Sequence, residues 1–219
     1  MATSDRFLIG HAATFDSPTE IRFEGAPFTE SIAPGAFSFV LGESRPGRQS
    51  TFVRDHEVGR LLGRNGKNLT LNEDVTGLHS KLHVPDTELG NDTYQLVKEG
   101  VLGGMSFAAR ITGEEWFEPE KPGIPHRVIT EVSRLLDVCA CTWPAYDKPS
   151  IETATRSEAA RSVRQLPDGD QPPRRSTEVQ RRLSEWIHKG YRRTTKPKFA
   201  KKLPTRRGCG HATEIGGGF

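Results

Sequence analysis

The 219-residue sequence has few cysteines, and their number and spacing do not suit a disulfide framework. The three are Cys139, Cys141 and Cys209, an odd and sparse set, whereas small secreted domains carry dense, even sets. We therefore expect a reducing compartment. Together with His211 the three thiols could supply four metal ligands, but the spacing matches no familiar zinc pattern, so buried, inert thiols are the favoured interpretation.

Long apolar runs are also missing. No window approaches the roughly eighteen uninterrupted apolar residues that a membrane helix requires. The first six residues, from Met1 to Arg6, lack the basic region and apolar stretch of a signal peptide. We therefore expect neither membrane insertion nor secretion.

Charge is divided unevenly along the chain, although the formal net charge is only +3. Residues 1–150 hold 15 Lys and Arg against 21 Asp and Glu, a net charge of −6. Residues 151–219 hold 16 against 7, a net charge of +9. A basic segment appended to an acidic body is typical of an interaction tail. We predict a folded body over 1–150 and a basic linker and tail over 151–219. Residues 147–176 are polar and proline-bearing, so we expect them to be disordered. An amphipathic helix is expected around 177–190.

Alternation of apolar and polar residues predicts a body made mainly of strands. The expected strands cover residues 6–14, 51–54, 68–72, 77–84, 105–112 and 126–143. A helix is expected from Asn91 or Asp92 to the glycines that begin at Gly100, and an acidic loop over 113–125. Many strands with few helices predict an α+β fold, mainly antiparallel β, rather than a βαβ repeat.

Two side chains are the leading candidates for chemistry. His56 ends a short expected strand between Asp55 and Glu57, where a general base would be presented at the surface beside a carboxylate. Ser106 comes directly after glycines, which let the backbone turn tightly and expose N–H groups near the hydroxyl, as an oxyanion site requires. Considered alone, Ser106 is more often interpreted as a surface serine that follows the end of a helix. Considered alone, His56 is more often interpreted as a histidine without a catalytic role.

Five sequence blocks occur in one order between residues 6 and 150. They are Glu30-x-Ile32-x-Pro34-Gly35-Ala36-Phe37, His56 followed by Leu61-Leu62-Gly63-Arg64, Gly104-Met105-Ser106-Phe107, Glu131, and Thr142-x-Pro144-Ala145-Tyr146. Together they resemble the HK97-type prohead (capsid maturation) protease family, which is similar in fold to the herpesvirus assemblins. The resemblance implies an assemblin-like antiparallel β-barrel with peripheral helices, to which the basic tail is attached.

The resemblance also implies the roles of single residues. Ser106 would be the nucleophile, His56 the general base, and Glu131 the carboxylate that orients and charge-stabilises His56. On residue type alone, Asp55 or Asp137 would serve as well as Glu131.

Oxyanion donors are expected among the backbone N–H groups near Ser106 and Phe107, with Arg110 and Arg134 as helpers. Neither a metal nor an organic cofactor is expected for this chemistry.

The function that the resemblance implies is a serine endopeptidase of a phage or prophage. It would cleave scaffold and capsid protein, and itself, inside the assembling procapsid in the host cytoplasm, and it could self-associate. One alternative is a non-catalytic capsid scaffolding or assembly module that binds through its basic tail. A third is nucleic-acid contact by the tail, because clustered Lys and Arg attract phosphates whatever the sequence.

Overall fold

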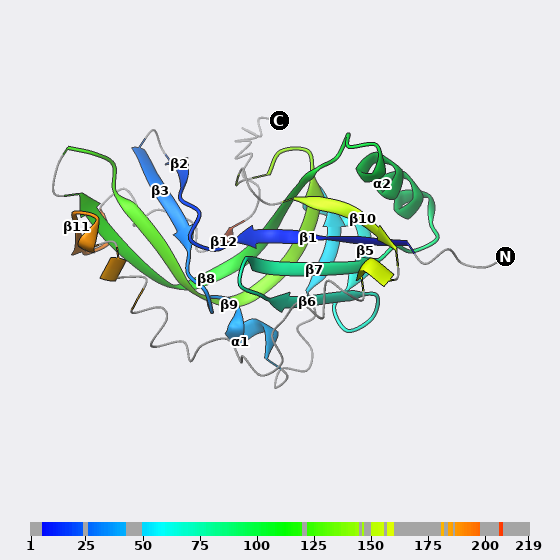
Figure 1. The fold of residues 1–219 in the computed structure, drawn as a ribbon, viewed down its shortest axis with the longest axis horizontal. Helices are drawn as coiled ribbons and strands as arrows, with labels where there is room; N and C mark the ends of the chain where they lie inside the picture. The colour runs from blue at the N-terminus through cyan, green and yellow to red at the C-terminus, as the bar shows by residue number, and fades with distance from the viewer. Residues whose placement is uncertain are drawn as a thin grey trace, which may run out of the picture.

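Two β-sheets share one apolar core in the computed structural model (Figure 1). The structure describes residues 6–23, 26–42, 50–119, 122–144, 146, 150–155, 157–159, 181, 184–185, 187–197 and 206–207. The small sheet has the order β10 (Ile151–Thr155), β1 (Arg6–Thr14), β7 (Gly77–His83) and β6 (Leu69–Glu73). The large sheet has the order β11 (Tyr191–Thr194), β8 (Gly104–Pro119), β9 (His126–Cys141), β3 (Ala26–Ile32) and β2 (Thr19–Phe23). In addition, β4 (Thr51–Arg54) pairs with β9 and with β5 (Glu57–Arg64), and β12 (Arg206–Arg207) pairs with β8.

The mainly β, α+β class is confirmed, but the expected barrel is wrong because neither sheet closes on itself through the strands that the structure describes. The strands β8 and β9 form a long antiparallel ribbon that bends near its middle (Figure 1). The edge of β9 that faces away from β8 has two partners, β3 at Arg127 and its neighbours and β4 at Val138 and its neighbours. The large sheet therefore forks along β9 instead of curling into a barrel.

Most of the expected strands are confirmed, and β1 has the bounds that its sequence pattern predicts. The expected acidic loop over 113–125 is wrong in its first half, because β8 continues to Pro119. Trp116 and Phe117 are buried in this half of the strand, and burial of two large aromatic side chains outweighs the low strand propensity of the glutamates around them.

The helices are few and short. The helix α2 (Glu88–Lys98) begins about three residues earlier than predicted, because Thr87 caps it by accepting a hydrogen bond from the Gly90 N–H at 3.1 Å. It ends before Gly100, whose φ of +70° suits glycine. The other helix, α1 (Ser38–Leu41), packs against β9. Among the described residues, none of the helices combines the length and the apolar character needed to cross a membrane.

The body continues past residue 150, because β10 pairs along the whole N-terminal half of β1. The expected disordered linker lies largely outside the described residues, as does the N-terminal part of the helix expected around 177–190. Residues 181, 184, 185, 187 and 188 are described, and all five are helical. Beyond them β11 joins the edge of β8, so the basic tail makes strand contacts with the body.

Candidate active site

Ser106 lies on β8 with its side chain on the face opposite the main core. Its neighbours Met105 and Phe107 point into the core and are almost fully buried, and side chains alternate between the two faces of a strand. The glycine before Met105 is required by packing, because a Cβ on Gly104 would lie 2.7 Å from the Cys141 carbonyl oxygen. The Ser106 Oγ is buried and has no hydrogen-bond partner among the described residues.

His56 occupies a two-residue turn between β4 and β5. Arg54 and Glu57 are paired across this hairpin, and the two residues between them, Asp55 and His56, have φ values of +53° and +58°. Positive φ at both central positions is what type I′ hairpin turns require. Residues other than glycine seldom adopt this conformation, although Asp and His do so more often than most, and such strain is concentrated at functional sites.

The strained turn is fastened to the end of β9. The Asp55 N–H donates to the Ala140 carbonyl at 3.0 Å, and the Asp55 Oδ1 accepts a hydrogen bond from the Thr142 N–H at 3.0 Å. The carboxylate next to His56 in sequence is therefore used to hold the turn, so it is not the group that faces the imidazole.

Asp137 is the carboxylate that faces His56. The Nδ1 of His56 lies 2.5 Å from the Oδ1 of Asp137, and only 8% of Asp137 is exposed to solvent. A short contact between an imidazole and a shielded carboxylate fixes the orientation of the ring and the tautomer with hydrogen on Nδ1. The Nε2 is then the ring nitrogen with a lone pair that can accept a proton.

The topology brings Ser106 and His56 to the same level of the large sheet. Cys139 on β9 is paired with Ser106 on one side and with Val53 on the other, and His56 follows three residues after Val53. Strands are spaced about 4.8 Å apart, so β8 and β4 lie about 10 Å apart across β9. Asp137 lies two residues before Cys139 and so shares its face, which places the serine, the histidine and the carboxylate on one side of the sheet.

Glu131, the third member expected from the resemblance, lies apart from this group. It lies on β9 six residues before Asp137, a separation of about 20 Å along an extended strand. Its side chain packs over Gly113 on β8, and its Oε1 accepts a hydrogen bond from the Thr112 hydroxyl at 3.1 Å. Asp137 is one of the carboxylates that residue type alone allows as a partner of His56, but only strand pairing places it next to the imidazole.

The expected oxyanion helpers lie on exposed parts of the same ribbon. Arg110 and Arg134 are paired directly across β8 and β9, and both are exposed. Arg110 is four residues from Ser106, or about 13 Å along the strand. The Phe107 side chain lies in the core, so this residue could contribute only through its backbone. Their roles at an oxyanion remain predictions.

In the described part of the chain, no three His, Cys, Asp or Glu side chains form a cluster that could hold a metal ion. Cys139 and Cys141 are buried cysteines, as expected, and they pack with Val53. Cys209 and His211 lie outside the described residues.

A buried charge network, which the sequence did not predict, occupies the other end of the ribbon. Glu30 is fully buried and Arg127 is 3% exposed. The Arg127 guanidinium donates to the Glu30 Oε2 at 2.7 Å and to the Glu114 Oε2 at 2.6 Å. Burial disfavours the charged form of Glu114, but Lys196 and Arg127 outweigh it and hold the pKa of this carboxyl below its ordinary value.

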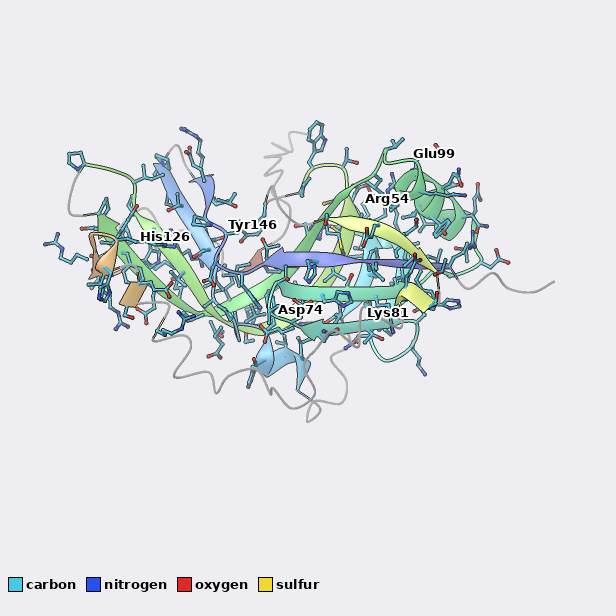
Figure 2. The ribbon with its side chains drawn as sticks, viewed as in Figure 1. Arg54, Asp74, Lys81, Glu99, His126 and Tyr146 are labelled. Atoms are coloured by element: carbon cyan, nitrogen blue, oxygen red, sulfur yellow. The ribbon has the colours of Figure 1, made fainter. Side chains whose placement is uncertain are left out.

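Tyr146 connects this network to the strand of Ser106. Its hydroxyl donates to the Glu30 Oε1 at 2.6 Å, and its ring stacks on Phe107 with the ring centroids 6.2 Å apart. Phe37 packs edge-on against the same Phe107 at 5.3 Å. The sequence blocks that contain these residues therefore meet in space directly behind Ser106, and Figure 2 shows Tyr146 near the middle of the molecule.

A buried histidine lies near the charge network. His126 has its two ring nitrogens 2.7 Å from the Thr29 hydroxyl and 2.9 Å from the Ser31 hydroxyl. Burial, together with the positive charge of Lys189, lowers the pKa of His126 to about 3. Figure 2 shows His126 at the end of the ribbon that is remote from Arg54. The histidine is therefore neutral and structural at neutral pH.

Comparison with known proteins gives one family match. The family model described as caudovirus prohead serine protease matches residues 2–163. A search of curated proteins finds no match. Among solved structures, the KSHV protease in complex with a hexapeptide phosphonate inhibitor is similar with a TM-score of 0.41 and 10% identity, over 84% of this chain and 88% of that chain.

Proposed function

Because the chain belongs to the caudovirus prohead serine protease family, as its sequence blocks predicted, we propose that Ser106, His56 and Asp137 are its catalytic triad. Membership makes the protein a peptidase of capsid maturation, which acts inside the assembling procapsid in the host. The observation that carries the proposed triad is the 2.5 Å contact between His56 Nδ1 and Asp137 Oδ1.

The proposed reaction is acyl transfer in two steps. The His56 Nε2 accepts the proton of the Ser106 hydroxyl while the Oγ attacks the scissile carbonyl, and the imidazolium then returns the proton to the leaving amine. Water hydrolyses the acyl-enzyme by the reverse proton transfers. Asp137 holds the ring and stabilises the imidazolium, and it keeps its negative charge throughout.

The negative oxygen of the tetrahedral intermediate needs donors beside Ser106. We propose that the backbone N–H groups near Ser106 and Phe107 supply them, with Arg110 and Arg134 adding positive charge at the surface. Neither a metal nor an organic cofactor enters these steps.

We further propose that the substrates are scaffold, the N-terminal segment of the capsid protein, and the enzyme's own tail. The direct test is to express the full chain and its Ser106→Ala form and to measure intact masses. The wild type should shorten and the variant should stay whole. If both stay whole and neither cleaves the cognate capsid protein, the proposed triad is wrong.

The scaffolding alternative is separated by a head-assembly assay with two variants. It requires that Ser106→Ala assembles and matures normal heads, whereas deletion of the tail prevents assembly. The deletion should begin at residue 160, because β10 is part of the small sheet and its loss would damage the body. Under the protease proposal, heads containing Ser106→Ala assemble but do not mature.

A further inference from the structure

The residue that follows Ser106 is held by two aromatic side chains. The Phe107 ring stacks on Tyr146 with the centroids 6.2 Å apart and meets Phe37 edge-on at 5.3 Å. Phe37 is fully buried and Phe107 is 1% exposed. Because Ser106 and Phe107 share one stretch of strand backbone in a close-packed interior, a displacement of the Phe107 ring is transmitted to the serine.

Phe37 is fixed by a carboxylate that the proposed mechanism does not use. The Glu73 Oε1 accepts a hydrogen bond from the Phe37 N–H at 2.9 Å, and the Glu73 Oε2 accepts one from the Ser38 hydroxyl at 2.8 Å. No side chain within α1 caps this end of the helix, and the first N–H groups of a helix have no partner inside it. A carboxylate from another strand supplies the missing acceptor.

Glu73 is the last residue of β6 and lies on its inner face. Leu69 and Leu71 share this face by alternation and are buried in the core. Burial raises the pKa of the Glu73 carboxyl above its ordinary value, although the hydrogen bonds from Phe37 and Ser38 oppose this rise. Removing a carboxylate from water costs free energy, and here that cost is set against hydrogen bonds to one short segment.

This segment, residues 33–38, connects the small sheet with the ribbon. The Ala33 N–H donates to the Ile129 carbonyl at 2.9 Å, and the Ala36 carbonyl accepts from the Val132 N–H at 2.8 Å. The helix α1 packs against β9 and lies beside the end of β6 (Figure 1). The backbone of the segment is therefore fastened to β9, whereas Glu73 fastens it to the small sheet.

The next residue, Asp74, faces the other way. Its Oδ2 lies 2.7 Å from the His11 Nε2. Its Oδ1 accepts hydrogen bonds from the N–H groups of Thr76 and Gly77 at 2.8 and 2.9 Å. Asp74 thus fixes the turn between β6 and β7 and has no described contact with Phe37. Two adjacent carboxylates with several hydrogen bonds each differ in whether they connect to Phe107.

We propose that Glu73 is a positioning residue of the peptidase, which fixes Phe37 against Phe107 and thereby holds Ser106 in line with His56. The proposal rests on the proposed function of Ser106 and His56. Glu73 touches neither the substrate nor the reacting atoms and transfers no proton. A misplacement of about 1 Å can slow a reaction about 100-fold, so a smaller shift of the serine is enough to lower kcat while KM holds.

The test compares Glu73→Ala, Glu73→Gln and Asp74→Ala in the full chain, with a peptide that contains the processed bond. Glu73→Ala should lower kcat about tenfold and change KM less than about twofold. Glu73→Gln should keep kcat within about twofold, because its amide oxygen accepts from Phe37 and its amide N–H donates to Ser38. Asp74→Ala loses its own hydrogen bonds and some stability, yet kcat should stay within about twofold.

The three variants separate positioning from general destabilisation. Equal kcat in Glu73→Ala and Asp74→Ala, measured where both proteins are folded, would overturn the proposal. A Glu73→Gln variant as slow as Glu73→Ala would overturn the claim that the two hydrogen bonds act, because the amide retains them.

Two further measurements distinguish failure of this proposal from failure of the proposed function. Amide hydrogen exchange of Phe37 reports its fastening without any need for activity, and it should rise in Glu73→Ala alone. Labelling of wild-type Ser106 by a fluorophosphonate probe reports the nucleophile. Absence of labelling would overturn the proposed function, whereas intact labelling with unchanged kcat in Glu73→Ala would overturn the role of Glu73 alone. Unchanged exchange of Phe37 would overturn the fastening.

A second variant tests the path through Phe37 and serves if Glu73→Ala does not fold. Phe37→Leu keeps the backbone donor to Glu73 and removes the ring from Phe107, so it should lower kcat by a similar factor. The double variant should be no slower than the slower single variant, because both changes act on one contact. Normal kcat in folded Phe37→Leu, or multiplied losses in the double variant, would overturn the path.

Discussion

The two arms of the β8–β9 ribbon are built from the same strands but treat polar groups differently. In the catalytic arm, residues 104–108 and 137–141, a serine hydroxyl is buried without a described partner beside a strained histidine turn. In the network arm, residues 114–119 and 126–129, the buried Arg127 is paired with two carboxylates. Buried polar groups that stabilise a fold have hydrogen-bond partners, whereas buried polar groups at functional sites are often left without them.

The largest expected effect concerns two carboxylates of β9, Asp137 and Glu131. Asp137→Asn keeps the shape but removes the charge that fixes the His56 tautomer, so kcat/KM should fall about 10³- to 10⁴-fold. Glu131→Gln is the matched control on the same strand and should change kcat/KM less than about twofold, because an exposed hydrogen bond contributes little. Hydrolysis of a peptide containing the processed bond measures both, and the opposite ranking would restore Glu131 to the triad.

The next effect is on stability and belongs to the network arm. Arg127→Met leaves Glu30 buried and without its cation, so the free energy of unfolding should fall by about 3 to 5 kcal/mol. Arg193→Met removes an exposed ion pair from the same arm and should cost no more than about 1 kcal/mol. Denaturant unfolding in Ser106→Ala background measures both. A loss below about 1 kcal/mol for Arg127→Met would show that the network is not structural.

The histidines of the two arms should respond to pH in different ways. Native His126 has its pKa lowered to about 3, whereas the unfolded chain binds this proton below about pH 6.5. Stability should therefore fall as pH decreases through the window between these values, by at most about 1.4 kcal/mol per pH unit. Unfolding of wild type and His126→Gln between pH 7 and 5 measures the difference in slope, and equal slopes would contradict the prediction.

In the proposed mechanism catalysis depends on His56, since only a neutral imidazole can act as the base. Activity should decline as the general base is protonated, which free histidine undergoes near pH 6.5, and His126→Gln should leave the midpoint of this decline unchanged. Rates at pH 5 to 8, at temperatures where both proteins stay folded, provide the measurement. A rate that is flat over this range would argue against His56 as the base.

The connection between the arms gives the smallest expected effect on catalysis. Tyr146→Phe keeps the ring on Phe107 but removes the donor to Glu30, and loss of a hydrogen bond to a charged group should cost about 1.5 to 3 kcal/mol of stability. If the connection positions Ser106, kcat should also fall by a small factor while KM holds. Unchanged kcat in a folded variant would make the contact purely structural.

Much of this arrangement could be predicted from the sequence. Local alternation was enough for β1, β6 and β7, and the ordered blocks were enough for the family. The carboxylate that faces His56 could not be predicted this way, because Glu131 and Asp137 lie on one strand and only the parallel pairing of β4 with β9 places His56 beside Asp137. The register between strands that are far apart in the sequence cannot be read from the local sequence pattern of either strand.

The tail illustrates the same limit. Counting charged residues shows the excess of positive charge in the tail, but it does not show which acidic surface the tail contacts. The acidic half of β8 was assigned to a loop because its glutamates disfavour a strand, and its pairing with β11 and Lys196 is a tertiary contact. Neither segment shows this pairing by itself, because each strand is stabilised by the other.

The turn at Asp55 and His56 has a consequence for engineering. Replacing the pair by Asn-Gly, the sequence that suits two positive φ values, would relieve the backbone and make the hairpin more stable, yet it would remove the proposed base. Asp55→Asn alone offers a milder relief, at some cost to the contact with Thr142. Selection for thermal stability alone would therefore favour inactive variants at this turn. Stabilising substitutions should be chosen outside the turn that carries His56.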